Sequence, residues 1–233
     1  MASTGSAGVP ISTDGGRVRV GGGSDIVPSS RGPSAGLRAK AAFDRVLAAG
    51  AMVVAAPVLA LVALAVRLDS PGPVLFRQPR YGLGGQVVMI TKFRTMRAES
   101  TDIVGARQAT KGDVRVTRTG RFLRRTCLDE LPQFWDVLMG RMSFVGPRPH
   151  PVGMTIEGRL AEDVIEHYWD RLRMRPGITG LAQVSGNRGP VPDIPTGQAR
   201  IDMDNAYIDG WTFWRDIAIL LRTLSVPFRK GSY

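Results

Sequence analysis

The chain has 233 residues, of which 43% are apolar and 22% are charged, and its formal net charge is +11. This length suits one domain with a tail, and the composition excludes a wholly disordered or fibrous protein. The single cysteine, Cys127, excludes an internal disulfide scaffold and a cysteine-rich zinc site, and it indicates a reducing compartment.

The first 37 residues contain nine glycines together with Ser, Thr and Pro, and their apolar residues show no period. This composition predicts a flexible tail over residues 1–37. The first 20 residues lack the apolar core of a secretory signal peptide, so we expect the tail to be retained.

Residues 46–66 form an uncharged apolar run, VLAAGAMVVAAPVLALVALAV. A helix of this length, at about 1.5 Å per residue, crosses a hydrocarbon core of roughly 30 Å, and the run lacks the polar face of a soluble core helix. Pro57 lies near its middle, and basic residues flank it on both sides. Proline bends a helix, and positive flanks favour the cytoplasmic side at both ends. The pattern predicts a re-entrant membrane helix over residues 38–67.

The remainder of the chain, residues 68–233, is predicted to form one small cytoplasmic α+β domain, because no second apolar run of comparable length follows. Residues 74–78 and 86–93 have the composition of short strands, and a glycine-rich turn joins them. This arrangement predicts one β-hairpin.

Three later segments have helical patterns. Residues 122–139 are predicted to be helical with an interruption before Pro132, and residues 156–172 carry apolar side chains at helical spacing. Residues 211–228 mix Trp and Leu with Arg. The last pattern predicts an amphipathic helix that packs on the core or lies in the headgroup region of a membrane.

The densest group of functional side chains lies in residues 117–149, where the adjacent carboxylates Asp129 and Glu130 stand among arginines. Arginine forks bind phosphate oxygens, and carboxylates hold a divalent cation or attack phosphorus. The combination therefore suits a phosphorylated substrate. Arg121, Arg124 and Arg125 precede the carboxylate pair, and Arg141 and Arg148 follow it.

Structural explanations stand beside this functional one. Thr126 and Asp129 have the spacing of a helix N-cap pair, and the arginines alone suit a solvated or lipid-facing surface. Pro147 and Pro149 fix the backbone on both sides of Arg148 and would aim its guanidinium, although a plain turn explains the same prolines.

Two further cations belong to the second predicted strand. Lys92 and Arg94 alternate about an apolar residue at strand period, which places both cations on one face. His150 and His167 have no partner at metal-ligand spacing, and we interpret them as structural or surface residues.

The chain resembles the bacterial sugar transferases, the monotopic phosphoglycosyl transferase family that moves a sugar phosphate from a nucleotide diphosphate sugar onto polyprenyl phosphate. The resemblance covers roughly residues 37–229. The matching motifs are LDSPGPVLFRQPRYG (68–82), KFRTM (92–96), TRTGRFLRRTCLDELPQFWDVLMGRMSFVGPRP (117–149) and RPGITGLAQVSG (175–186). Long motifs in this order are highly specific.

The resemblance implies that Asp129 attacks the phosphorus nearest the sugar and that Glu130 is its partner carboxylate. It also implies that Mg²⁺ bridges Asp129 and the diphosphate. It further implies that the Pro-Arg-Pro segment and neighbouring arginines contact the phosphates or the nucleotide. Together with the cations of the second predicted strand, the residues predicted to bind substrate are Lys92, Arg94, Arg121, Arg124, Arg125, Pro147, Arg148, Pro149 and Arg175.

The implied partners are a nucleotide diphosphate sugar, most commonly a UDP-hexose, together with polyprenyl phosphate and membrane lipid. The implied location is the cytoplasmic face of the inner membrane, and the implied reaction is the first membrane step of exopolysaccharide, capsule or O-antigen assembly. Self-association into a homo-oligomer is left open. Two positions depart from the family pattern, because Ala56 and Cys127 stand where serine is frequent.

Two alternatives from other functional classes remain at this point. The basic excess lies in residues 67–150, which contain 15 basic and seven acidic residues, and such a surface suits a membrane-tethered module that binds nucleic acid or lipid. A scaffold subunit of a polysaccharide export complex is the second alternative. Neither explains the carboxylate pair inside the arginine group, and we expect no nucleic-acid partner.

Overall fold

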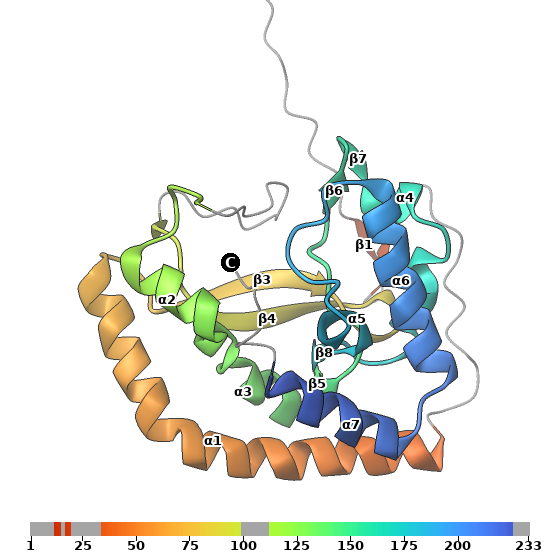
Figure 1. Cartoon of the computed structure of the whole chain (residues 1–233), viewed down its shortest axis with the longest axis horizontal. Coiled ribbons are helices and arrows are strands. Elements are labelled where there is room, and N and C mark those ends of the chain that lie inside the picture. Colours follow the sequence, from red (N-terminus) through yellow and green to blue (C-terminus); the bar gives the residue numbers. More distant parts are fainter. Residues whose placement is uncertain (1–11, 15–16, 20–33, 99–111, 226–233) are drawn as a thin grey trace, which may run out of the picture.

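A computed structural model of the chain describes residues 12–14, 17–19, 34–98 and 112–225 (Figure 1). Most of the tail predicted over residues 1–37 lies outside the described residues, and its flexibility stays a prediction. Within that segment, strands β1 (Ser12–Asp14) and β2 (Arg17–Arg19) pair antiparallel. The described chain mixes helices and strands, which confirms the predicted α+β class.

The apolar run lies within one helix, α1 (Ala35–Asp69), which contains Pro57 in its interior. Figure 1 shows α1 running along the bottom of the molecule and then turning upward at the left. A bend is expected where proline removes an i to i−4 hydrogen bond. Among the described residues, α1 is the one helix that is long and apolar enough to cross a membrane, by length and composition.

The predicted hairpin is confirmed by strands β3 (Leu75–Tyr81) and β4 (Val87–Phe93), which pair antiparallel. A short 3₁₀ turn, η1 (Leu83–Gly85), joins them. Gly84 and Gly85 have φ of 64° and 77° in this turn, a left-handed conformation that glycine adopts without steric cost. The hairpin lies at the centre of the molecule in Figure 1.

A second pairing connects two segments that are far apart in the sequence. Strands β5 (Ser143–Val145) and β8 (Gly177–Thr179) pair in parallel. The chains approach so closely here that a Cβ built on Gly177 would lie 2.1 Å from the backbone nitrogen of Gly146. The pairing places the segment that contains Arg148 directly after β5, against the start of β8.

Helices surround these strands. They are α2 (Arg118–Thr126), η3 (Leu128–Glu130), α3 (Gln133–Leu138), α4 (Ala161–Val164), η4 (Tyr168–Arg173), α5 (Leu181–Val184), α6 (Ile194–Asp209) and α7 (Phe213–Thr223). The sequence analysis did not predict α6, although Asp193 caps it through a 2.8 Å hydrogen bond from Thr196 N and a proline occupies its first turn. Both are usual helix-start signals.

The helix predicted over residues 156–172 is wrong. The segment forms the end of hairpin β6 (Thr155–Ile156) and β7 (Arg159–Leu160), followed by α4 and η4. Glu157 and Gly158 have positive φ in the hairpin turn, and His167 has a φ of 56° before η4. Left-handed residues at these points interrupt a right-handed helix.

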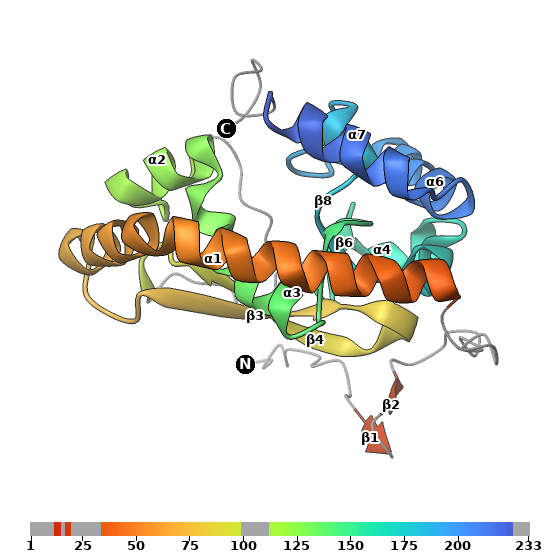
Figure 2. The same cartoon turned by 90° about the horizontal axis from the view of Figure 1, so that it is seen from below.

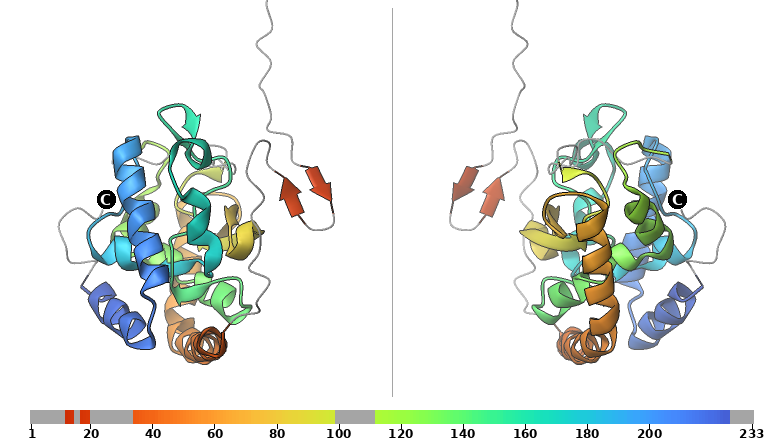
Figure 3. Two further views of the ribbon diagram at one scale, coloured as in Figure 1. Left: turned by 90° about the vertical axis from the view of Figure 1, so that its right-hand side faces the viewer. Right: turned by 90° about the vertical axis from the view of Figure 1, so that its left-hand side faces the viewer.

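Buried apolar side chains attach both halves of α1 to the rest of the chain. Ala48 of its first half joins a cluster with residues of α3, β4, β5 and α7. Val62 and Val66 of its second half pack with Phe93 and with Leu123 of α2. Figure 2 views α1 from below, and Figure 3 shows its first half end-on with α7 beside it.

Candidate active site

A cavity of about 920 Å³ is bounded by residues of α1, α2, α7 and the β3–β4 hairpin. Its lining includes Asp129 and Glu130, and it also includes Lys92 of β4 and Arg148. Four predicted site residues from two separate motifs therefore share one cavity.

The two carboxylates stand in a tight connection between helices. α2 ends at Thr126, its C-cap Cys127 has a left-handed φ of 59° and ψ of 15°, and the single turn η3 follows immediately. This reversal allows Asp129 and Glu130 to follow α2 without continuing its axis. A left-handed residue other than glycine is uncommon and marks a position fixed by its surroundings.

The alternative in which Thr126 and Asp129 form a helix cap is wrong. The hydroxyl of Thr126 donates to the carbonyl oxygens of Phe122 and Leu123 at the end of α2. Asp129 makes no hydrogen bond or ion pair with any residue that the structure describes. Its carboxylate is therefore not used by the helix.

Glu130 is held by two cations. Lys92 Nζ lies 2.5 Å from Glu130 Oε1, and Arg148 Nη2 lies 2.7 Å from the same oxygen. Burial acts against the charged form, but the charges and hydrogen bonds of Arg148 and Lys92 outweigh it and hold the pKa of Glu130 well below its usual range. Glu130 is therefore ionised at neutral pH.

Asp129 has the opposite environment. Burial raises the pKa of Asp129 to about 6, with Lys92 opposing the shift and the charge of Glu130 adding to it. The carboxylate is ionised in most molecules at neutral pH, yet no donor among the described residues satisfies it. A pair of neighbouring carboxylates with pKa values moved in opposite directions is typical of a divided catalytic role.

Arg148 is supported from behind by a buried ion pair. Arg171 donates from Nη2 to the backbone carbonyl of Arg148 and also lies 2.7 Å from Asp204 Oδ2. The side chains of Arg171 and Asp204 are each 1% exposed. The backbone of the Pro-Arg-Pro segment is therefore fixed independently of the guanidinium of Arg148.

Comparison with known proteins identifies the family. The chain matches the family described as "Bacterial sugar transferase" over residues 35–230. It belongs to this family.

Several relatives carry informative names. An "Exopolysaccharide production protein PSS" of Rhizobium leguminosarum bv. phaseoli is 45% identical over 192 residues, covering 82% of this chain and 96% of the relative. A "UDP-glucose:undecaprenyl-phosphate glucose-1-phosphate transferase" of Escherichia coli is 46% identical over 211 residues, covering 89% of this chain and 45% of the relative. A protein of the same name from Caulobacter vibrioides is 48% identical over 187 residues, covering 79% of this chain and 68% of the relative. The chain thus spans less than half of the E. coli relative.

Of the other residues predicted to bind substrate in this bacterial sugar transferase, some line the cavity and some do not. Arg124 lines the cavity and donates from Nε to Thr95 Oγ1 at 2.8 Å. Arg94 also lines the cavity, but its guanidinium donates to the carbonyl oxygens of Ser70 and Pro71 just after α1. Arg94 therefore fixes the exit of the apolar helix.

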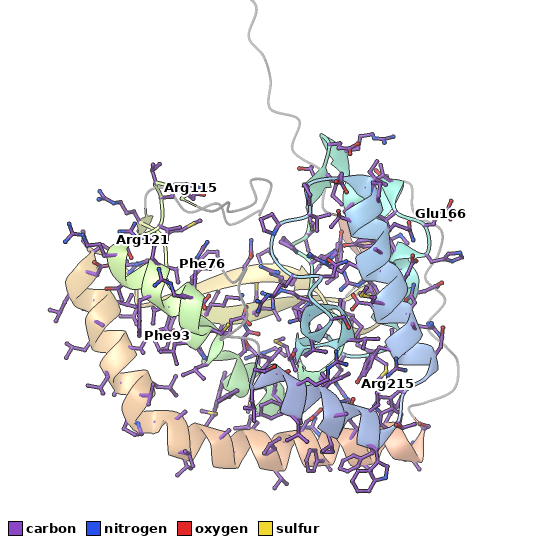
Figure 4. All side chains as sticks on the ribbon, viewed as in Figure 1. Phe76, Phe93, Arg115, Arg121, Glu166 and Arg215 are labelled. Carbon is purple, nitrogen blue, oxygen red and sulfur yellow. The ribbon has the colours of Figure 1, made fainter. Side chains whose placement is uncertain are left out.

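Pro149 lines the cavity, and its carbonyl oxygen accepts a 2.5 Å hydrogen bond from Arg80. Pro147 is buried beside β8 and accepts from Gly177 N at 2.9 Å. The remaining three predicted residues are not among those that line the cavity. Arg121, labelled in Figure 4, and Arg125 are exposed on α2, and Arg175 donates from Nε to Gly140 O at 3.0 Å.

Sequence reasoning missed several cavity residues. Arg80 lies two residues after Gln78 on β3, and both line the cavity. His150, interpreted from sequence as structural or surface, is buried in the cavity wall. Burial and the charge of Arg171 lower the pKa of His150 well below its usual value, so its imidazole is neutral. The strand period of Gln78 and Arg80 was the available signal.

The donor set suits Mg²⁺ held mainly by substrate. No group of three or more His, Cys, Asp or Glu side chains capable of holding a metal occurs within the described ranges. Asp129 nevertheless offers an unpaired carboxylate inside the cavity. Mg²⁺ is commonly bound by one or two carboxylates, substrate phosphates and water, and Asp129 fits that role.

Proposed function

We propose that this bacterial sugar transferase moves a sugar 1-phosphate from a nucleotide diphosphate sugar to polyprenyl phosphate, with release of a nucleoside monophosphate. The observation that carries the proposal is the unpaired carboxylate of Asp129 beside Glu130, whose charge is already neutralised by Lys92 and Arg148. The names of the E. coli and C. vibrioides relatives describe the same reaction class.

The chemistry follows as two displacements at one phosphorus. A carboxylate oxygen of Asp129 attacks the phosphorus nearest the sugar, and the bond to the nucleoside monophosphate breaks with its electron pair leaving on that product. The sugar phosphate remains on Asp129 as a mixed anhydride. An oxygen of polyprenyl phosphate then attacks the same phosphorus, and Asp129 leaves as a carboxylate.

The surrounding cations make this attack feasible. A dianionic diphosphate is repelled by a bare carboxylate unless positive charge lies close by. Glu130 fixes Lys92 and Arg148 beside Asp129, where they are placed to meet the phosphate oxygens. Mg²⁺ held by Asp129 and the donor phosphates would supply further charge neutralisation.

The membrane placement belongs to the same proposal. α1 enters from the cytoplasmic face of the inner membrane, bends and returns, so that the protein is monotopic. Its apolar side chains include the exposed Val53 and Val54, which water would not stabilise. Exposed Trp135 of α3 and Trp214 of α7 are typical of the membrane interface.

The donor proposed for the first test is UDP-glucose, within the broader class of UDP-hexoses. Several relatives are named for UDP-glucose, whereas one from Aeromonas hydrophila, 38% identical over 185 residues, is named for UDP-N-acetylgalactosamine. The proposed product is the first lipid-linked intermediate of an exopolysaccharide, in keeping with the name of the Rhizobium relative.

The test separates a covalent route from direct transfer. Purified protein mixed with Mg²⁺ and UDP-hexose should release about one UMP per protein before any lipid is added, and intact-protein mass should show a hexose-phosphate adduct on Asp129. Asp129→Asn should abolish both signals, whereas Glu130→Gln should slow them. Turnover with lipid but without early UMP or adduct would favour direct attack by the lipid. Absence of turnover with every donor would favour a binding or scaffold module.

A further inference from the structure

The cavity around Asp129 has two chemically different parts. One group of its cations belongs to β3, at the centre of Figure 1, and to the segment that leads through α6, at the right; one group of its apolar side chains belongs to α1, α3 and α7 along the bottom. The cations of the first group are Arg80, Arg188 and Arg200, and the apolar residues of the second are Leu47, Ala51, Phe134, Leu220, Leu221 and Leu224. Arg115 and apolar residues of β3, β4, β5 and β8 also belong to the lining.

We propose that the space between α1 and α7 is a slot for the prenyl chain of the acceptor, with the acceptor phosphate at Asp129. This inference rests on the proposed function, because it assigns a place to the second substrate of that reaction. The proposal specifies the two helices that hold the prenyl chain and the side chains that determine the affinity for the acceptor lipid.

The slot is closed at one end. Phe43 of α1 and Phe213 of α7 meet there with ring centroids 5.2 Å apart. Beside them, Lys40 Nζ lies 2.6 Å from Asp216 Oδ2, and both side chains are buried. These contacts fix the separation between the first turn of α7 and the second and third turns of α1.

Further along both helices the facing side chains line the cavity. Leu47 and Ala51 follow Phe43 by about one and two turns, and Leu220 and Leu221 stand two turns after Phe213. A pair of helices joined at one end and lined with apolar side chains at the other forms a wedge suited to a narrow apolar chain.

The exposed apolar side chains of the slot indicate which kind of molecule would cover them. Leu221 and Leu224 are 64% and 71% exposed, although they line a cavity that also contains a carboxylate pair and several cations. A prenyl phosphate combines one anionic end with an apolar chain, so it matches both parts at once. A nucleotide sugar has no comparable apolar part, and the cationic end suits its diphosphate. Donor and acceptor would thus reach Asp129 from different ends.

Two substitutions test the slot, and each has a matched control. Leu221→Gln removes an apolar wall, and Ala51→Leu narrows the space. Trp214→Gln changes a 76% exposed apolar side chain of the same helix that does not line the cavity. Ala56→Leu makes the Ala51 change at an exposed position of α1 outside the lining.

The measurement uses full-length protein in detergent micelles with undecaprenyl phosphate. Leu221→Gln should raise the KM for this lipid by about tenfold, the effect expected when roughly one apolar side-chain contact is lost. Ala51→Leu should raise it by a similar factor, because the larger side chain occupies space that the prenyl chain needs. The KM for the nucleotide sugar and the lipid-free release of UMP should stay at wild-type values, which also shows that the variants fold. Both controls should keep the wild-type KM for the lipid.

Several results would overturn the slot. One is an unchanged lipid KM in both slot variants, and another is an equal rise in the controls, which would indicate general membrane contact. A lipid KM that falls on removal of residues 226–233, with Leu221→Gln then silent, would assign the space to the C-terminal segment. Failure of the proposed function is distinct, because wild-type protein would then release no UMP and make no lipid product.

Discussion

The guanidinium of Arg148 and the carboxylate of Glu130 meet inside the cavity, with Nη2 2.7 Å from Oε1. The contact uses part of the arginine fork, and Lys92 shares the same carboxylate oxygen. The charge of Arg148 also lowers the pKa of Asp129, although the ion pair that its guanidinium makes is with Glu130. The pair keeps one carboxylate occupied and leaves its neighbour free to react.

Replacing Arg148 should therefore weaken catalysis more than folding. Arg148→Ala should reduce kcat/KM by an amount equivalent to about 2 to 4 kcal/mol of transition-state stabilisation. Arg148→Lys keeps the charge but loses the planar fork, so an intermediate loss is expected. Steady-state kinetics at saturating lipid measure this, with melting temperature as the control. Wild-type kcat/KM in Arg148→Ala would exclude a role in phosphate binding.

The pH dependence should report the ionisation of Asp129. A nucleophilic carboxylate must be deprotonated, and the pKa of Asp129 is raised to about 6. Lipid-free UMP release should therefore fall by about tenfold per pH unit below that value and level off above it. This half-reaction avoids the phosphate of the lipid, which titrates in the same range.

A substitution of Lys92 should shift the inflection of this pH profile in a known direction. Lys92 lowers the pKa of Asp129 through its positive charge, so Lys92→Met should move the inflection to higher pH. Arg159→Gln, at an exposed strand residue outside the cavity, should leave it in place. An inflection that stays fixed in Lys92→Met would contradict control of the rate by Asp129.

Local patterns predicted the hairpin and the bent helix, because alternation, glycine turns and proline act over a few residues. The helix predicted over residues 156–172 was wrong for an informative reason. Ile156, Ile165, Tyr168 and Leu172 share one buried cluster, as helical spacing suggested, but they reach it from separate short elements. Gly158 was the local signal against a helix.

In the candidate site, too, local motifs were predictable from the sequence and tertiary contacts were not. Asp129 and Glu130 could be predicted because both belong to one motif, whereas their contact with Lys92 and Arg148 depends on tertiary packing. Arg121 and Arg125 were grouped with them by charge alone. On a helix, residues 118, 121, 122 and 125 share a face, and the structure turns that face away from the cavity. The parallel β5–β8 pairing had no local signal.

That pairing makes Gly177 a sensitive position. A side chain there would lie 2.1 Å from Gly146 N and 2.4 Å from Thr179 O, so the two strands would have to separate. Gly177→Ala should lower the free energy of unfolding by about 3 kcal/mol. Gly50→Ala is the control, because a Cβ at Gly50 meets nothing within 4 Å. Equal melting temperatures of the two variants in one detergent would contradict the close approach.

Removal of divalent cations should abolish UMP release. The carboxylate of Asp129 is the unpaired acidic group beside the proposed phosphate position, and Mg²⁺ shared with the donor would reduce the repulsion between them. Excess chelator should stop the lipid-free reaction, and added Mg²⁺ should restore it. Asp204, already paired with Arg171, gives no reason to expect a second metal requirement. Full activity in chelator would remove Mg²⁺ from the proposal.

The topology of α1 can be tested through Pro57. Both ends of a re-entrant helix lie on the cytoplasmic side, so cysteines introduced at Ser29 and Arg159, in a Cys127→Ala background, should react with an impermeant thiol reagent only from that side. Pro57→Leu restores the missing backbone hydrogen bond and removes the steric cause of the bend. A fraction of Ser29→Cys molecules should then become reactive from the opposite side, because a straight helix of this length can span. The Arg159→Cys site should stay cytoplasmic in both backgrounds. External labelling of Ser29→Cys while Pro57 is intact would show a spanning helix and refute the re-entrant arrangement.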